Sequence, residues 1–365
     1  MNILKPILFL TLFLFSGNLI AAQPAKLFEV NGSFEDAIMS DGILFLAVKD
    51  GEGIDPDLRV FRVDDKGKPE EIGSYRSKEY AHSLARKGNY LYLINGKFGL
   101  EVIDISNPAK PDLVHFMPLD GYTHKIEIEG ELAYVTAGFE GMHILDISNP
   151  AKPGLISTFQ AYAPPGDDEG ADGIFQDRED YGSSTEDYGD ERQYSEGATI
   201  DLTWEDMISV EGAIDVTISG ELAYIAYGSE GVVIVDISNP LKPVMVSSTR
   251  LEKPAESVFL SRKTLYTTLG LGGMHLIDVA HPKTPRILSQ IHTRCYPMDV
   301  SVIRERAFVA DGICAEESLY VLNVADSRHP RIEQAFSGRV NSVKLLSDSI
   351  LAMGPNFARA YSLEF

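Results

Sequence analysis

The chain has 365 residues and a formal net charge of −22 at neutral pH, from 54 acidic and 32 basic residues. Its hydrophobic fraction of 44% and aromatic fraction of 9% are typical of a folded globular protein, which excludes an intrinsically disordered chain. A protein this acidic repels nucleic-acid phosphates and anionic lipid headgroups, so we expect no nucleic acid and no membrane surface among its partners.

The first 22 residues have the features of a secretory signal peptide. Lys5 precedes the apolar run Ile7–Phe15, and small residues follow up to Ala22. The run is short for a membrane-spanning helix, although an uncleaved anchor is the alternative. We therefore expect an exported protein, located in the periplasm, at the cell surface or outside the cell. Residues 23–365 would form its mature chain, with no membrane span.

An eight-residue string reveals an internal repeat. "DISNPAKP" occurs at Asp104–Pro111 and again, 42 residues later, at Asp146–Pro153, and "DISNPLKP" occurs at Asp236–Pro243. A period in this range is typical of repeated supersecondary units. Alignment on the string yields seven units, which begin near Asp36, His82, His124, Ile214, Glu256, Met298 and Asn341.

Each unit has the pattern of four short strands joined by tight turns. In the third unit, "KIEI", "LAYVTA", "MHILDI" and "GLISTF" are rich in strand-forming residues, and "EGE", "GFEG" and "SNPAKP" separate them. The last unit lacks a fourth strand, and "KLFEV" at Lys26–Val30 supplies a spare one. We therefore predict an all-β, seven-bladed β-propeller of four-stranded antiparallel blades, closed when the N-terminal strand completes the last blade. A linear β-solenoid or open array is the alternative.

The repeats resemble a known family. "GLEVIDISNP", "GMHILDISNP" and "GVVIVDISNP" are similar to the LVIVD repeat, and the similarity extends over nearly all of the mature chain. The resemblance implies a secreted or surface β-propeller. It implies no catalytic residues, because the family has no shared catalytic motif.

Propellers usually bind their ligands where the innermost strands begin, at the mouth of the central channel. The alignment predicts these residues at the mouth: Asp36, His82, His124, Asp215, Glu256, Asp299 and Asn341. Two imidazoles and several carboxylates are ligands that a divalent transition metal accepts, so a metal set of His82, His124, Asp36 and Glu256 is one interpretation. A hydrated polar channel without a ligand is the other.

An acidic insertion of 48 residues separates the third unit from the fourth, at about residues 162–210. It holds fifteen acidic residues and two arginines, and it repeats "EDYG". Linkers between blades lie on the same face as the channel mouth, as do the turns between the second and third strands. We therefore predict that one face collects the aromatic residues Phe98, Phe139, Tyr162, Phe175, Tyr181, Tyr188 and Tyr194.

Three functions fit this face. It binds another extracytoplasmic protein through tyrosine anchors in a charged surround, which makes the chain a non-catalytic scaffold. It binds Ca²⁺ or serves adhesion, although no Asp-x-Asp-x-Asp-Gly loop is present. Or the channel mouth belongs to a metal-dependent hydrolase or lyase. We expect the scaffold, without a resident cofactor; Ca²⁺ and a divalent transition metal are the candidate ions.

The two cysteines indicate a disulfide. Cys295 precedes the innermost strand of the sixth unit, and Cys314 follows its second strand. If Ile303 faces Arg306 in this hairpin, Cys295 faces Cys314. A disulfide fits an exported protein, and a reactive or metal-binding pair is the alternative.

Overall fold

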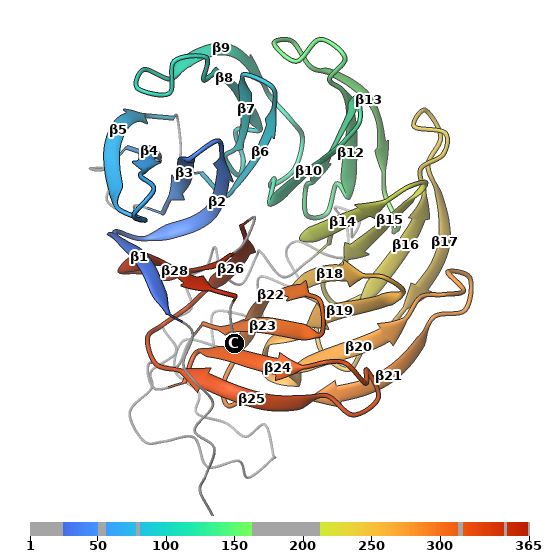
Figure 1. The fold of residues 1–365 in the computed structure, drawn as a ribbon. Coiled ribbons are helices and arrows are strands. Elements are labelled where there is room, and N and C mark those ends of the chain that lie inside the picture. The colour runs from blue at the N-terminus through green and yellow to red at the C-terminus, as the bar shows by residue number, and fades with distance from the viewer. Residues whose placement is uncertain are drawn as a thin grey trace, which may run out of the picture.

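A computed structural model describes residues 25–49, 56–77, 81–162, 212–312, 317–346 and 349–363. These residues form seven four-stranded antiparallel sheets arranged in a ring, as Figure 1 shows. The predicted seven-bladed β-propeller is therefore confirmed. No helix in this part of the chain is long and apolar enough to cross a membrane.

The blades follow one another along the chain. The first has β2 (Phe34–Ser40), β3 (Ile43–Val48), β4 (Leu58–Val63) and β5 (Pro69–Tyr75). The second has β6 (Ser83–Lys87), β7 (Tyr90–Ile94), β8 (Leu100–Asp104) and β9 (Asp112–Met117). The third has β10 (Lys125–Glu129), β11 (Leu132–Thr136), β12 (Met142–Asp146) and β13 (Gly154–Phe159).

The fourth blade has β14 (Asp215–Ser219), β15 (Leu222–Ala226), β16 (Val232–Asp236) and β17 (Val244–Thr249). The fifth has β18 (Ser257–Ser261), β19 (Thr264–Thr268), β20 (Met274–Asp278) and β21 (Arg286–Ile291), with the short 3₁₀ helix η1 (Gly270–Gly272) before β20. The sixth has β22 (Pro297–Ile303), β23 (Arg306–Asp311), β24 (Leu319–Asn323) and β25 (Arg331–Phe336). The seventh has β26 (Ser342–Leu345), β27 (Ser349–Met353), β28 (Phe357–Ser362) and β1 (Lys26–Asn31).

The two ends of the chain meet in the seventh blade. β1 pairs antiparallel with β28, from Asn31 opposite Phe357 to Lys26 opposite Tyr361 (Figure 1). The Arg359 side chain adds an ion pair with Glu29 at 2.8 Å. The predicted closure of the ring by the N-terminal strand is therefore confirmed.

The apolar core lies between blades rather than inside one sheet. Seven clusters of buried residues each draw on two adjacent blades. Tyr134 and Ile144 of the third blade, for example, pack with Val216 and Ile225 of the fourth. Strands covered on both faces need apolar residues on both faces. This explains why second strands such as β7 (Tyr90–Ile94) and β15 (Leu222–Ala226) have continuous apolar runs instead of alternating ones.

The repeated "DISNP" string forms the corner between the third and fourth strands. The Asp146 carboxylate accepts the backbone N–H of Ser148 at 2.8 Å, and Asp104 and Asp236 accept the equivalent N–H at 2.8 and 2.9 Å. These bonds lower the pKa of the three carboxyls. The string therefore favours the turn, as the sequence predicts.

The corner also joins neighbouring blades, which the sequence did not predict. Tyr92 of the second blade donates a hydrogen bond to the Pro150 carbonyl in the corner of the third, at 2.8 Å. Ser157 donates to the Pro240 carbonyl at 2.6 Å, one boundary further on. Because proline lacks an N–H but keeps its carbonyl, the corner offers an acceptor to the preceding blade.

The opposite end of the blades contains turns that require glycine. Gly141 has a φ of 85°, and a Cβ there would lie 2.1 Å from the Phe159 carbonyl oxygen. A side chain at this position would push β13 away from the turn. Glycine thus holds the turn between the second and third strands close to the outermost strand.

Two predictions concern residues that the structure does not describe. Cys314 lies outside the described residues, so its disulfide with Cys295 stays a prediction. The predicted pairing of Ile303 with Arg306 is confirmed, but a β-bulge between Pro297 and Asp299 shifts the register by one residue before Cys295. Of the insertion, only Tyr162 is described, and the chain is described again from Gly212.

Candidate binding site at the channel mouth

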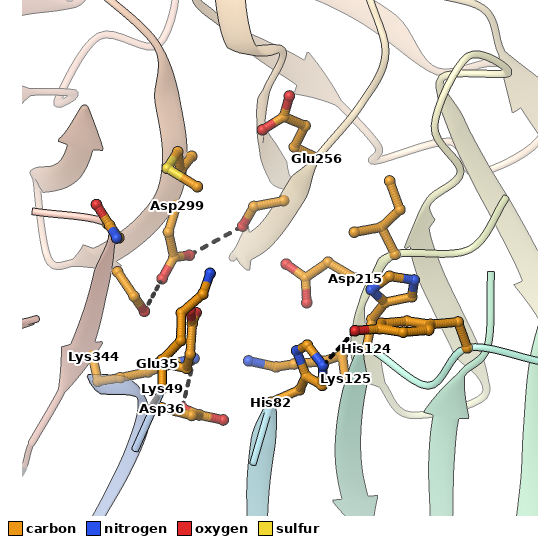
Figure 2. A pocket seen from close by; sticks show the side chains of 16 residues that line it. Glu35, Asp36, Lys49, His82, His124, Lys125, Asp215, Glu256, Asp299 and Lys344 are labelled. Atoms are coloured by element: carbon orange, nitrogen blue, oxygen red, sulfur yellow. Dashed lines mark hydrogen bonds and ion pairs between the residues drawn. The ribbon is translucent and has the colours of Figure 1, made fainter. Parts of the chain in front are cut away.

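A cavity of about 240 Å³ opens where the innermost strands begin. Figure 2 shows side chains of several blades pointing into it. All seven residues that the sequence places at the mouth line the cavity. The other lining residues are Glu35, Lys49, Tyr122, Lys125, Ile214, Ser257, Met298, Ser342 and Lys344.

The alignment of the first blade is wrong by one residue. Asp36 pairs with Ala47 across its hairpin, as Asp215 pairs with Ala226 and Asp299 with Ala310. Asp36 is therefore equivalent to these two aspartates, and Glu35 is the residue equivalent to His82. The hairpin turn accounts for the error. Asp41 and Gly42 form the turn of the first blade, whereas Gly88 and Asn89 form that of the second, so alignment on the glycine misplaces the strand by one residue.

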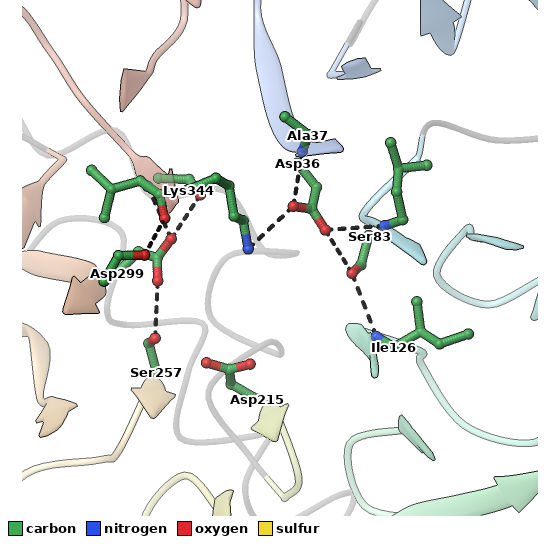
Figure 3. Close-up of polar contacts among 12 residues, drawn as sticks. Asp36, Ala37, Ser83, Ile126, Asp215, Ser257, Asp299 and Lys344 are labelled. Carbon is green, nitrogen blue, oxygen red and sulfur yellow. Dashed lines mark hydrogen bonds and ion pairs between the residues drawn. The ribbon is translucent and has the colours of Figure 1, made fainter. Parts of the chain in front are cut away.

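Three of the predicted mouth carboxylates join adjacent blades (Figure 3). Asp36 accepts hydrogen bonds from the Ser83 hydroxyl at 2.8 Å and from the next backbone N–H at 3.0 Å. Asp299 accepts the same pair of bonds from Ser342, at 2.7 Å, and from the N–H after it, at 3.0 Å. Asp215 accepts an N–H from the fifth blade at 2.9 Å. These carboxylates thus have a structural role in the ring.

Similar bonds cross the remaining boundaries between blades. Asp299 also accepts the Ser257 hydroxyl of the fifth blade at 3.1 Å. The Ser83 hydroxyl accepts an N–H of the third blade at 3.4 Å, and Glu127 accepts one of the fourth at 3.1 Å. Lys344 of the seventh blade forms an ion pair with Asp36 at 3.1 Å. Together these contacts form a polar belt around the channel, and each of the seven boundaries has at least one of them.

Two lysines balance the acids of the belt. Burial alone would raise the pKa of Asp36, but the Lys344 and Lys125 ammonium groups and two hydrogen bonds lower this pKa to about 2. Burial would lower the pKa of Lys125, but Asp36, Asp215 and Asp299 raise it. Glu127 responds differently, because burial raises its pKa to about 7. Asp36 and Lys125 therefore stabilise each other's charged forms in the channel.

One side of the mouth consists of three rings that pack edge-on or tilted against one another. His82 Nε2 lies 2.8 Å from the Tyr122 hydroxyl, and the Tyr122 ring lies 5.0 Å from that of His124, centroid to centroid. Burial lowers the pKa of His82 to about 3 and that of His124 to about 4. Both imidazoles are therefore neutral at physiological pH and supply hydrogen-bonding groups rather than charge.

The mouth has a second tyrosine pair three blades away. The Tyr296 hydroxyl hydrogen-bonds to the Glu256 carboxyl, and burial raises the pKa of Glu256 to about 8. In both pairs the tyrosine lies 40 residues after its partner, in the loop before the next innermost strand. A glycine of the turn between the second and third strands, Gly96 or Gly270, packs against each pair. The repeat therefore produces the same arrangement twice.

The predicted metal ligands do not form a prearranged metal site. Among the described residues, no group of three or more His, Cys, Asp or Glu side chains is arranged to hold a metal ion. Asp36 lies in the belt with Lys344, His82 is bonded to Tyr122, and Glu256 is bonded to Tyr296. His82 and His124 have ring centroids 6.4 Å apart, and both rings pack against Tyr122.

The described aromatic residues of the predicted partner face lie outside the cavity. Phe98 and Phe139 lie in turns at the mouth end of the blades, and 41% of the surface of Phe139 is exposed. Tyr162 packs edge-on against Tyr227 at 5.8 Å and donates a hydrogen bond to Ser248 at 3.0 Å. The remaining predicted residues, Phe175, Tyr181, Tyr188 and Tyr194, lie outside the described residues.

Sequence reasoning missed several residues of the cavity. Tyr122 and the belt residues Lys125, Ser257 and Lys344 were not among the predicted ones. Lys125, Ser257 and Ser342 directly follow predicted mouth residues, so the alignment contained a usable signal.

Solved structures of low sequence identity share this fold. A computationally designed protein, Ika8, has a TM-score of 0.58 at 7% identity, over 93% of this chain and 98% of its own. The WD40 β-propeller domain of Doa1 has a TM-score of 0.64 at 9% identity, over 93% and 96%. The β-propeller domain of Cps50 (Swd1) from Myceliophteria thermophila has a TM-score of 0.63 at 9% identity, over 93% and 100%. No curated protein matches the sequence.

The sequence itself matches a family model in three places. The model of the LVIVD repeat matches residues 79–116, 120–161 and 212–250. These segments contain the second, third and fourth blades, which carry the three "DISNP" corners. The resemblance that the sequence suggested is confirmed: the chain is a seven-bladed β-propeller that carries LVIVD repeats.

Proposed function

We propose that the chain is an exported, non-catalytic scaffold that binds another extracytoplasmic protein through the mouth face of the propeller. The mouth face is defined here by the turns between second and third strands and by the rim of the channel. The observation that supports the proposal is that the repeat is interrupted at this face. The segment 163–211 leaves the third blade after Tyr162 and returns at Gly212.

Exposed apolar side chains lie at the mouth end of several blades. Ala213 bridges to Gly138, next to Phe139, in the turn of the third blade. Leu271 in the turn of the fifth blade is 47% exposed, and Met298 at the channel rim is 37% exposed. Apolar anchors within a charged surround are typical of protein-binding surfaces. The insertion contains fifteen acids, and its described ends lie at this face.

A comparative capture experiment tests the proposal. Mature protein is immobilised and exposed to an extracytoplasmic extract, beside two separate variants: the double substitution Phe139→Asp/Leu271→Asp, and a deletion of residues 166–197. The matched control is Leu241→Asp, because Leu241 is 74% exposed in a corner turn at the opposite end of the blades.

We expect one set of proteins to bind the wild type and the Leu241→Asp variant, and to be lost from the other two. Equal capture by all four proteins would contradict a docking role of the mouth face. Fractionation of cells that produce the full chain tests export separately, and recovery only from the cytoplasm would contradict it.

A further inference from the structure

A group of buried oxygen atoms lies between the first and second blades, outside the mouth cavity. Glu101 of β8 and Asn95, the residue after β7, are both fully buried. The Glu101 Oε1 and Asn95 Oδ1 atoms have no hydrogen-bond partner among the described residues. An unpaired oxygen is costly to bury, and an unpaired charge is more so. A ligand that satisfies both atoms would therefore stabilise the fold.

The pairing of the strands places these two side chains on the same face of the second blade. Glu101 pairs with Leu93, and Asn95 lies two residues after Leu93 and continues the ladder through its N–H bond to the Gly99 carbonyl at 3.1 Å. Leu93 packs in one apolar cluster with Phe45 of the first blade. Glu101 and Asn95 therefore face the first blade as diagonal neighbours, whose side chains can reach one another.

The first blade adds a second carboxylate to this group. Asp57, which is 7% exposed, accepts the Ser77 backbone N–H at 2.7 Å, and the Ser77 hydroxyl accepts the Asn95 amide N–H at 2.9 Å. Two residues before Ser77, the Tyr75 hydroxyl donates to Glu101 Oε2 at 3.0 Å. These bonds hold Asp57, Asn95 and Glu101 together across the boundary. They use the amide nitrogen of Asn95 and leave its oxygen for a ligand.

The group carries an excess of negative charge. Burial raises the pKa of Asp57 and the Glu101 charge adds to this effect, although the Ser77 N–H and the Arg76 charge act in the opposite direction. Burial, Glu101 and Asp57 also raise the pKa of Tyr75. The two carboxylates are thus within electrostatic range of each other, and a cation beside them would offset the cost of burying both.

The third blade shows that the repeat can bury a polar side chain here with every atom satisfied. His143 is its equivalent of Glu101, and its ring nitrogens bond to the Thr158 hydroxyl and the Asp120 carbonyl, each at 2.8 Å. Thr158 stands opposite His143, whereas Phe116, which has no polar side-chain atom, stands opposite Glu101. The unsatisfied oxygen is therefore a departure from the repeat and not a consequence of the fold.

We propose that Asp57, Asn95 and Glu101 bind a divalent cation between the first and second blades, and that this cation is Ca²⁺. Carboxylate and amide oxygens are ligands that Ca²⁺ accepts in irregular geometry, whereas Mg²⁺ requires a near-ideal octahedron and Zn²⁺ prefers nitrogen and sulfur. Water molecules would complete the coordination, as is usual for Ca²⁺. The group differs from a site of three His, Cys, Asp or Glu side chains, because one of its ligands is an amide.

Calorimetric titration of EDTA-treated mature protein with CaCl₂ tests the proposal. We expect saturable binding, and an unfolding temperature that rises with the Ca²⁺ concentration, because the folded protein binds the ion and the unfolded chain does not. MgCl₂ should bind more weakly, and equal or tighter binding of Mg²⁺ would contradict the choice of Ca²⁺. If Ca²⁺ does not bind or does not change the unfolding temperature, a proton or a water molecule joins the two oxygens and the proposal is wrong.

Variants locate the ion. Glu101→Gln keeps an acceptor for Tyr75 and offers an N–H to Asn95, so without Ca²⁺ it should be at least as stable as the wild type. Because it removes a charged ligand, its Kd for Ca²⁺ should rise at least about tenfold, and that of Asn95→Ala about fivefold. If Glu101→Gln does not fold, Asn95→Ala and Asp57→Asn decide. An unchanged Kd in these variants would overturn the assignment.

Two controls separate this site from other acids of the chain. Glu71→Gln removes a carboxylate of the first blade that pairs with Arg59 at 2.7 Å, and it should change the Kd less than about twofold. Deletion of residues 166–197 should also leave the Kd within about twofold, whereas a Kd raised as much as in Glu101→Gln would place the ion in the insertion and overturn the proposal. Since protein docking is tested by capture and this site by the Kd for Ca²⁺, either proposal can fail without the other.

Discussion

The belt and the mouth of the channel consist of residues that are neighbours in the sequence but differ in role. Ser257 bonds across a blade boundary, and the residue before it, Glu256, lines the mouth and bonds to a tyrosine. The same holds for Ser83 and His82. The belt residues Ser83 and Ser257 bond across blade boundaries, whereas at the mouth the Asn341 Oδ1 atom is buried without a hydrogen-bond partner among the described residues. One position along an innermost strand thus separates the residues that hold the ring together from those available for recognition.

The largest contrast between belt and mouth should appear at Asp299 and Met298. Asp299→Ala removes an acceptor of four hydrogen bonds, so we expect it to lower the free energy of unfolding by about 4 kcal/mol. Met298→Ala, in the partly exposed mouth, should cost less than about 1 kcal/mol. Urea unfolding followed by circular dichroism measures both. Similar losses of unfolding free energy in the two variants would contradict the distinction between a structural belt and a mouth that is not needed for stability.

The ion pair between Lys344 and Asp36 should be the next largest contribution. Lys344→Met leaves the Asp36 carboxylate without its contact cation at the boundary where the ring closes, and we expect a loss of about 3 kcal/mol at pH 7. In the wild type, the pKa of about 2 means that Asp36 stabilises the fold above its ordinary pKa of 3.8 and loses this contribution as the pH falls toward 2. The variant should therefore show a flatter decline of stability over that range of pH. A parallel decline in both proteins would contradict the role given to this pair.

Glu256 at the mouth should affect the free energy of unfolding with a pH dependence opposite to that of Asp36. The pKa of Glu256 rises from 4.5 to about 8 on folding, so the folded protein binds more protons than the unfolded one in this window, and stability falls as the pH rises. Glu256→Gln keeps a partner for Tyr296 without this penalty. Because the cavity is partly open to water, we expect the variant to gain about 2 kcal/mol relative to the wild type between pH 5 and pH 9. Chemical denaturation at a series of pH values measures the difference, and a constant difference would argue against a protonated Glu256.

The smallest effect should come from the outer corner, far from both regions. Ser157→Ala removes the hydrogen bond to the Pro240 carbonyl and should cost about 1 kcal/mol, without any change of ligand affinity. Ser148→Ala, in an exposed part of a corner, is the control and should stay within about 0.5 kcal/mol of the wild type. A loss at Ser157 as large as that at Asp299 would mean that the belt has no special importance.

The architecture could be predicted from the sequence because each blade repeats the same local sequence pattern. Turn residues at a fixed period, continuous apolar strands and the spare strand at Lys26–Val30 all point to one closed ring. The site was harder to predict. The cross-blade bond between Tyr122 and His82 depends on packing between units, which no local pattern encodes. The position of Asp36 was missed because the glycine of its hairpin turn is shifted by one residue relative to the second blade. Asp36, Asp215 and Asp299, which the sequence suggested as ligand-binding residues, instead accept hydrogen bonds from backbone N–H groups of the next blade.

The pairing of β1 with β28 determines when the protein can finish folding. The Glu29–Arg359 contact joins residues 330 positions apart, so the last blade cannot form until the final strand has left the ribosome or export channel. Such a closure has a large loop entropy and favours slow, all-or-none completion. Until that moment the first and seventh blades expose their apolar faces, and a nascent chain in this state is vulnerable to aggregation and proteolysis. Its survival during biosynthesis therefore depends on how quickly its two ends find each other.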